Sequence, residues 1–257
     1  MPRFFVKPEN ILSDSIIIDG DDVKHIKNVL RLRCNDIITL CDGMGTDFTA
    51  RIEKFESNLI YADIIDRREN TTEPPIEVAL FQGIPKSDKM DLIIQKSVEL
   101  GVTRIVPVIT DRTVVVLRTE KDKASKTNRW QRIAMEAAKQ SNRGIIPIVD
   151  LPLDFNKALE SAKEMQLGII PYEKENEKSL KVVLKDFSAK SIAVFIGPEG
   201  GFSQDEIDEA ISAGMKPVSL GPRILRTETA GIAVLSVVMY EFGGFDCLNE
   251  ERGSKTK

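Results

Sequence analysis

The sequence predicts an α/β protein with a second, β-rich domain at its N-terminal end. From residue 76 onward, short apolar runs alternate with segments of helical period, whereas residues 1–70 hold mostly short strand-like runs. Such alternation is typical of a mostly parallel sheet with helices on both faces. At 257 residues and 42% hydrophobic, the chain can bury a sizeable core and form one or two domains.

The first 70 residues predict a small β-barrel with one helix. Turn residues separate the expected strands, and DDVKHIKNVLR (21–31) has helical spacing. The strands are SIIID (15–19), DIITLCD (36–42), FTARIEKF (48–55) and NLIYADII (58–65), and DGMG (42–45) is the expected hairpin turn. The polar stretch ENTTEPP (69–75) ends in two prolines, so we place a linker at 71–75.

Residues 76–247 form the expected α/β domain, followed by a polar tail at 248–257. The expected strands are IEVALFQG (76–83), RIVPVIT (104–110), LGIIPY (167–172), SIAVFIG (191–197) and KPVSLG (216–221). The expected helices are DKMDLIIQKSVELG (88–101), NRWQRIAMEAAKQS (128–141) and ETAGIAVLSVVMYEF (228–242). The last helix is apolar from 230 to 240 and should be buried nearly all round, in a dimer interface or in a monomer core.

Three strand ends carry unusual loops, at 169–173, 196–201 and 219–230. Ligands bind at the carboxyl ends of strands in open α/β sheets, so a site is expected where these loops converge. In GPEGG (197–201) three glycines let the main chain approach a ligand closely, although a tight strand–helix connection explains them equally well. The spacing matches neither a P-loop nor a G-x-G-x-x-G fingerprint. Ser203 and Glu206 have the spacing of a capping box, which predicts a helix start.

Composition excludes several classes of protein. No run of 18 apolar residues occurs and the first residues do not resemble a signal peptide, so a cytoplasmic protein without membrane segments is expected. Three cysteines and one histidine indicate neither a disulfide framework nor a histidine-based metal site. Net charge is −4, yet residues 84–143 carry thirteen Lys/Arg against seven Asp/Glu. This excess indicates either a polyanion site or a solvated helix face.

The stretch FIGPEGGFSQDEI (195–207), with LGPRILRTETA (220–230), resembles the bacterial 16S ribosomal RNA (uracil-N3) methyltransferases of the RsmE type, in the trefoil-knotted SPOUT superfamily. PRFFV (2–6), HIKNVLRLR (25–33), QGIPKSDKMDLIIQKSVELGV (82–102) and RWQRIAMEAAKQSNR (129–143) extend the resemblance along the chain. It implies a PUA-like N-terminal barrel for RNA, a knotted domain for S-adenosylmethionine, a homodimer, and 16S rRNA in the small ribosomal subunit as substrate.

The same resemblance implies which residues bind the cofactor. They lie in the three strand-end loops: Ile170, Pro171, Gly197, Pro198, Glu199, Gly200, Gly201, Leu220, Gly221, Arg223, Ile224 and Leu225. For Leu220 and Leu225, core packing is the simpler explanation from the sequence alone.

Arg226 is the expected catalytic residue. Uracil must lose its N3 proton, and a permanently charged guanidinium can stabilise the resulting anion. Glu228 and Glu199 are candidates to orient arginines or to accept the proton, although a carboxylate with a pKa of about 4.3 is a weak base for this task. Pairing of Arg226 with one of these glutamates is an alternative. Methyl transfer from a sulfonium needs no metal.

Eleven basic residues are candidates for RNA binding: Arg3, His25, Arg31, Arg33, Lys86, Lys89, Lys96, Arg112, Arg129, Arg132 and Arg143. Lys89 and Lys96 are seven residues apart and share a helix face, and a solvated face remains the alternative for each residue. Trp130 is assigned to packing. Competing functions are a knotted methyltransferase of another RNA, a ribosome-assembly protein without chemistry, and a nucleotide-dependent oxidoreductase.

Overall fold

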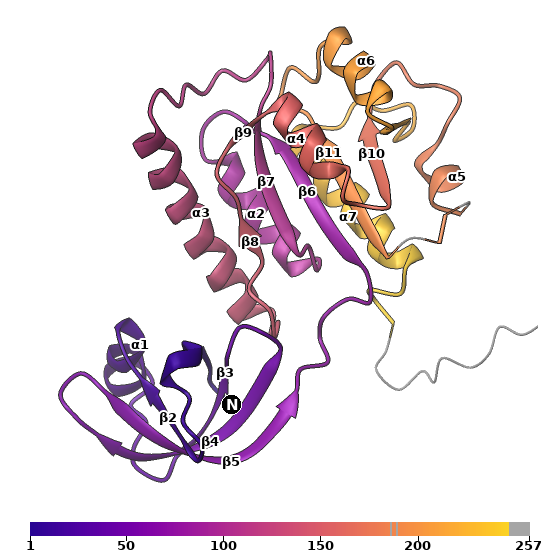
Figure 1. The fold of residues 1–257 in the computed structure, drawn as a ribbon. Coiled ribbons are helices and arrows are strands. Elements are labelled where there is room, and N and C mark those ends of the chain that lie inside the picture. Colours follow the sequence, from indigo (N-terminus) through magenta and orange to yellow (C-terminus); the bar gives the residue numbers. More distant parts are fainter. Residues whose placement is uncertain (186, 189, 247–257) are drawn as a thin grey trace, which may run out of the picture. The chain divides into compact units, whose positions relative to one another are not determined.

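The computed structural model describes residues 1–185, 187–188 and 190–246 (Figure 1). The chain divides into two compact units. The first contains residues 1–73 and 138–146, and the second contains residues 74–137 and the chain from 147 onward. The predicted tail at 248–257 lies outside the described residues.

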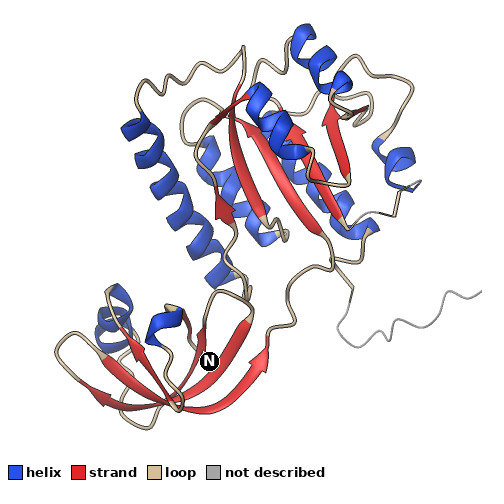
Figure 2. Cartoon of the chain, viewed as in Figure 1, coloured by secondary structure: helices blue, strands red, loops and turns tan. Residues whose placement is uncertain are grey.

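The first unit is a five-stranded mixed sheet around its own apolar core (Figure 2). Its strand order is β1-β3-β4-β5-β2, and only the β1–β3 pair is parallel. The path has two edge strands, β1 and β2, rather than the closed ring of a complete barrel. The elements are β1 (Arg3–Phe5), a 3₁₀ turn (Pro8–Asn10), β2 (Ser15–Ile18), α1 (Asp21–Lys24), a π-helical turn (His25–Val29), β3 (Ile37–Cys41), β4 (Thr46–Phe55) and β5 (Ile60–Glu69).

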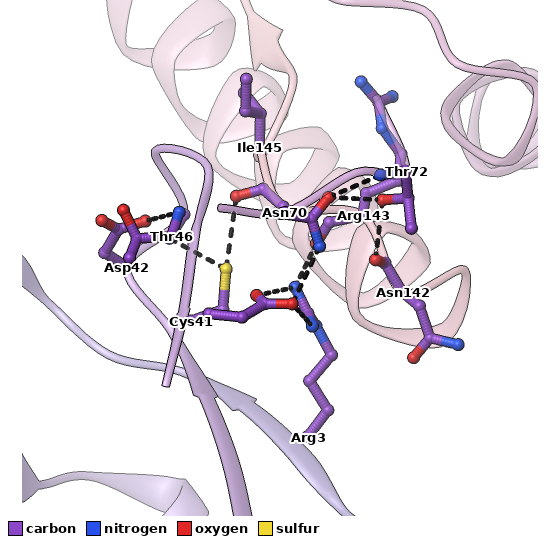
Figure 3. A network of polar contacts seen from close by, with 12 residues as sticks. Arg3, Cys41, Asp42, Thr46, Asn70, Thr72, Asn142, Arg143 and Ile145 are labelled. Atoms are coloured by element: carbon purple, nitrogen blue, oxygen red, sulfur yellow. Dashed lines mark hydrogen bonds and ion pairs between the residues drawn. The ribbon is translucent and has the colours of Figure 1, made fainter. Parts of the chain in front are cut away.

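The segment 138–146 belongs to the first unit, which corrects the domain assignment made from the sequence. Glu73 accepts hydrogen bonds from the backbone amides of Gly144 and Ile145, both at 3.0 Å. The same carboxylate pairs with the buried guanidinium of Arg143 at 2.5 Å. The Cys41 thiol donates a hydrogen bond to the Gly144 carbonyl at 3.3 Å (Figure 3). This thiol is buried, and burial raises its pKa to about 12. These contacts join residues far apart in sequence, so no local pattern reveals them.

A second buried ion pair connects to this segment. Arg3 binds Asp47 at 2.8 Å and also donates to the carbonyl of Arg143 at 2.9 Å (Figure 3). Asn70 donates to the same Asp47 carboxylate at 3.0 Å. The side chains of Arg3 and Asp47 are 8% and 5% exposed, so this network is part of the interior of the first unit.

The second unit is the predicted α/β domain with a parallel sheet. Its strand order is β12-β10-β11-β6-β7-β8, with the short β9 also paired to β7, and every pair is parallel. The strands are β6 (Glu77–Gly83), β7 (Arg104–Ile109), β8 (Ile148–Val149), β9 (Leu153–Asp154), β10 (Leu167–Pro171), β11 (Ser191–Ile196) and β12 (Lys216–Val218). The helices are α2 (Lys89–Glu99), α3 (Glu120–Gln140), α4 (Phe155–Ala162), α5 (Leu180–Lys185), α6 (Gln204–Ser212) and α7 (Thr227–Glu241).

Helices cover both faces of this sheet (Figure 1). Helices α4 and α6 pack on one face, over an apolar cluster that contains the stacked rings of Phe81 and Phe195, 4.5 Å apart. Helix α7 packs on β11 and contacts α2 and α5 on the other face. Helix α3 begins eight residues before the predicted start, and α4 and α5 were not predicted because their apolar stretches are short. Trp130 is buried, as expected.

Within a single chain, helix α7 is not buried all round, so a monomer core alone does not bury it and the dimer interface stays a prediction. Val234 and Leu235 are fully buried, whereas Val237 is 41% and Tyr240 is 76% exposed. One side of the helix packs within the unit, and the other side leaves apolar side chains accessible. The sequence does not distinguish the two sides, because both are apolar. No helix in the described part of the chain is both long enough and apolar enough to cross a membrane.

Candidate functional site

The loops after β10, β11 and β12 converge on one pocket of about 690 Å³. These strands are neighbours in a parallel sheet, so their carboxyl ends lie at the same edge. Eleven of the twelve residues proposed for cofactor binding line this pocket, and so does Arg226. Convergence of the three loops, expected from the sequence, is therefore present.

Ile170 is the residue of that set that does not line the pocket. It is fully buried in the apolar cluster beneath α4 and α6, whereas the next residue, Pro171, lines the pocket. Successive side chains of a strand point to opposite faces, so two neighbours seldom serve one cavity. The prediction for the Ile170 side chain is corrected to a core position.

The glycine loop, residues 197–201, has no room for side chains at its closest approaches. A Cβ atom on Gly197 would lie 3.0 Å from the Cα of Gly201, and Gly201 itself has a φ of +68°. The guanidinium of Arg112 donates to the carbonyl of Gly200 at 2.6 Å. Arg112, which the sequence suggested for RNA, is therefore bound to this loop.

The capping box predicted at the start of α6 is present. The Ser203 hydroxyl accepts a hydrogen bond from the Glu206 amide at 3.2 Å, and the Glu206 carboxylate accepts one from the Ser203 amide at 2.8 Å. Glu206 also accepts from the amide of Asp111 at 2.9 Å. The box therefore ties the far end of the glycine loop to the loop that follows β7.

A buried hydrogen-bond chain fixes the near end of the glycine loop. The Thr227 hydroxyl donates to the Gly197 carbonyl at 2.6 Å and accepts from the Gln82 amide at 2.9 Å. Gln82 is 0% exposed at the end of β6. Sequence reasoning missed this contact, although a lone amide side chain closing the apolar run VALFQ was a usable signal.

Lys89 bridges the two glutamates considered for catalysis. Its ammonium lies 3.2 Å from Glu199 and 3.2 Å from Glu228. The two adjacent carboxylates, Glu199 first and then Glu228, raise the pKa of Lys89. Partial burial alone raises the pKa of Glu199, but backbone amides, among them that of Lys86, and the Lys89 ammonium lower it overall. The backbone amide of Glu228 lowers the pKa of its own carboxyl group. Burial raises this pKa, but the nearby Lys89 ammonium lowers it further, so the overall shift is downward.

Arg226 precedes α7 and lines the pocket with an exposed side chain. Within the described residues, no carboxylate forms an ion pair with it, because Lys89 holds both Glu199 and Glu228. The alternative in which these glutamates pair with Arg226 is thus not the arrangement found. The guanidinium remains available to an anionic ligand.

Three further pocket residues, Tyr172, Glu173 and Asn176, were not named from the sequence as cofactor-binding residues. Tyr172 and Glu173 lie in the strand-end loop 169–173 where the site was expected, and Asn176 comes a few residues after it. The Tyr172 hydroxyl donates to Gln204 at 2.9 Å, which links this wall to the first residue of α6.

The proposed RNA-binding residues fall into three groups. Arg3 and Arg143 are buried in the ion pairs of the first unit, so their surface role is corrected to a structural one. Lys89, Lys96, Arg112 and Arg129 bind acceptors within the second unit, namely Glu199 and Glu228, Glu99, the Gly200 carbonyl and Asp91, respectively. The exposed remainder consists of His25, Arg31, Arg33, Lys86 and Arg132.

Residues 72–239 match the model of an RNA methyltransferase domain, and residues 18–65 match that of an RNA methyltransferase PUA domain. The chain belongs to the RNA methyltransferase family. It is 33% identical to ribosomal RNA small subunit methyltransferase E of Bacillus subtilis over 94% of this chain and 97% of the relative. A relative of the same name from Mesomycoplasma hyopneumoniae is 34% identical over 92% of this chain and 98% of its own length.

Two solved structures of methyltransferases are similar to this chain in both sequence and fold. Ribosomal RNA small subunit methyltransferase E of Neisseria gonorrhoeae, bound to S-adenosyl methionine, is 37% identical with a TM-score of 0.81, covering 93% of this chain and 97% of that one. A putative methyltransferase of Legionella pneumophila, also with bound cofactor, is 33% identical with a TM-score of 0.83 and the same coverage. The methyltransferase fold and the N-terminal PUA domain implied by the resemblance are confirmed. The trefoil knot stays a prediction.

Proposed function

We propose that this protein transfers a methyl group from S-adenosylmethionine to N3 of a specific uridine in 16S rRNA, within the assembled small ribosomal subunit in the cytoplasm. The observation that carries the proposal is one pocket in which a glycine loop and an unpaired arginine, Arg226, lie together. The near full-length similarity to small-subunit methyltransferases supports the RNA target.

The pocket suits a cofactor of this size and chemistry. Its volume of about 690 Å³ lies within the range of roughly 300–1,000 Å³ that is usual for small-molecule sites. The main chain of 197–201 and 220–225 would hold the adenosine, because backbone groups can close over a purine where glycines leave no side chains in the way. S-adenosylmethionine supplies a methyl group that its sulfonium has already activated.

Arg226 would stabilise the uracil anion left when the N3 proton goes to solvent. A preorganised guanidinium acts strongly on charge that develops in a partly enclosed site. Glu199 and Glu228 would not serve as the base, because the bound Lys89 ammonium and nearby amides keep both carboxylates ionised and weakly basic. Their proposed role is to shape the pocket around Arg226.

The RNA would be held by the first unit and by exposed cations of the second. His25, Arg31 and Arg33 lie within or just after the π-helical turn of the PUA domain, and all three are exposed. Irregular turns of this kind are frequent at functional sites. Reaction at N3 requires a uridine that is unpaired and unstacked, so the target should be a splayed base.

We further propose that the protein is a homodimer joined through the exposed side of α7, which carries Val237 and Tyr240. Exposed apolar side chains in one stripe are typical of an interface with a copy of the same chain. Val237→Asp should shift the protein from dimer to monomer in light scattering after size exclusion, because a carboxylate would be desolvated at the interface. A wild-type monomer would contradict the dimer.

The decisive test of the function is nucleoside mass spectrometry. Small subunits that lack the modification would be incubated with the protein and isotopically labelled S-adenosylmethionine. Labelled 3-methyluridine in 16S rRNA is the expected product. Cofactor binding without this product would move the search to another RNA, such as a tRNA, and failure to bind the cofactor would favour a ribosome-assembly role without chemistry.

A further inference from the structure

Lys89 joins three separate elements at the edge of the pocket. It lies in the first turn of α2, whereas Glu199 lies in the glycine loop after β11 and Glu228 in the first turn of α7. Its ammonium is 3.2 Å from each carboxylate. A single cation therefore neutralises two anions that are supplied by segments about thirty residues apart in the sequence.

Removal of this cation would leave two carboxylates as close neighbours without their shared partner. Like charges at short range repel, so the glycine loop and the start of α7 would separate. The positive charge of Arg226 already stabilises the ionised form of Glu228, although less than the charge of Lys89 does. Without Lys89, the Arg226 guanidinium would be drawn toward Glu228 and away from the pocket.

We propose that Lys89 is a positioning residue that fastens the glycine loop to α7 and, by neutralising the charge of Glu228, keeps Arg226 unpaired. This inference deepens the proposed function and depends on it. Lys89 thus maintains the geometry of the pocket. Its position in a basic segment of the sequence had instead suggested contact with RNA.

The test uses the full-length protein and variants that separate charge from bulk. Lys89→Met removes the ammonium, and Lys89→Arg keeps a cation that can bridge two carboxylates. Glu228→Gln removes one of the two anions, alone and together with Lys89→Met. Lys163→Met is the matched control, because Lys163 pairs with Glu160 at 2.6 Å on an exposed helix surface outside the pocket.

Two measurements are made without turnover. Hydrogen exchange of the amides of residues 197–203 in the ligand-free protein reports how firmly the glycine loop is held. Calorimetric titration with S-adenosylhomocysteine measures the affinity of the pocket for the reaction product. Because this product lacks the sulfonium charge, it is not attracted directly to unpaired carboxylates, and such attraction cannot hide a loss of affinity caused by a displaced loop.

Lys89→Met should speed exchange in 197–203 and weaken S-adenosylhomocysteine binding about tenfold, whereas Lys163→Met should change neither. Lys89→Arg should be within about threefold of wild type. Glu228→Gln should weaken binding in the wild-type background but improve it in the Lys89→Met background, because there it relieves repulsion.

The proposal is overturned if Lys89→Met keeps wild-type exchange and affinity. It is also overturned if Glu228→Gln changes affinity by the same factor in both backgrounds, since the two residues would then act independently. Absence of S-adenosylhomocysteine binding to the wild-type protein would instead contradict the proposed function, and the exchange measurement would still decide whether Lys89 holds the loop.

Discussion

Replacement of Arg226 by alanine should lower kcat for uridine methylation by about 10²–10³-fold, while S-adenosylhomocysteine affinity stays within about threefold. The side chain lines the pocket without an ion pair among the described residues, so its loss removes no contact that holds the fold. In the reaction, its charge acts on the uracil anion as that anion forms. Single-turnover methylation of small subunits and calorimetric titration of the same variant measure the two quantities.

Two comparisons separate this role from a general loss of RNA affinity. Arg226→Lys keeps the charge but not the planar fork of donors, so its rate should fall between those of wild type and alanine. A subunit with 5-fluorouridine at the target has a more acidic N3, so the deficit of Arg226→Ala should shrink. An equal deficit with both substrates, or a rate unchanged by the alanine substitution, would contradict the assignment to N3 ionisation.

The pocket was predictable from the sequence because most of its residues lie in two short motifs. GPEGG and LGPRILR each follow a strand, and the neighbouring strands of a parallel sheet bring such loops to one edge. The resemblance to the family also placed Ile170 in the site, because a motif does not show which side of a strand each residue faces. Burial in the apolar cluster decided that question.

The positions of basic residues in the sequence did not predict which of them are free to bind RNA on the surface. Lys89 was grouped with the RNA-binding cations because its segment is basic, but its partners lie more than 100 residues away in Glu199 and Glu228. Arg3 and Arg143, 140 residues apart, meet inside the first unit. A basic residue is recognised as structural only when its carboxylate is known to be near, and such pairings are tertiary.

Glu73→Ala is expected to destabilise the first unit by about 3 kcal/mol, because it leaves the buried guanidinium of Arg143 without its carboxylate. The substitution also removes the acceptor of the backbone amides of Gly144 and Ile145, which hold the segment 138–146 in this unit. Native-state hydrogen exchange of amides in β3 and β4 measures the free energy of opening of this unit directly.

Glu56→Ala provides the control, since Glu56 pairs with Lys54 at 3.1 Å while both side chains are about half exposed. Exposed pairs contribute little, so this change should stay within about 0.5 kcal/mol. If Arg143 served RNA rather than the fold, Glu73→Ala would alter opening no more than Glu56→Ala and would strengthen RNA binding by releasing a cation. Loss of stability without such a gain would instead show that the sheet needs residues 138–146 to complete its interior, although residues 74–137 of the α/β domain separate this segment from residues 1–73 in the sequence.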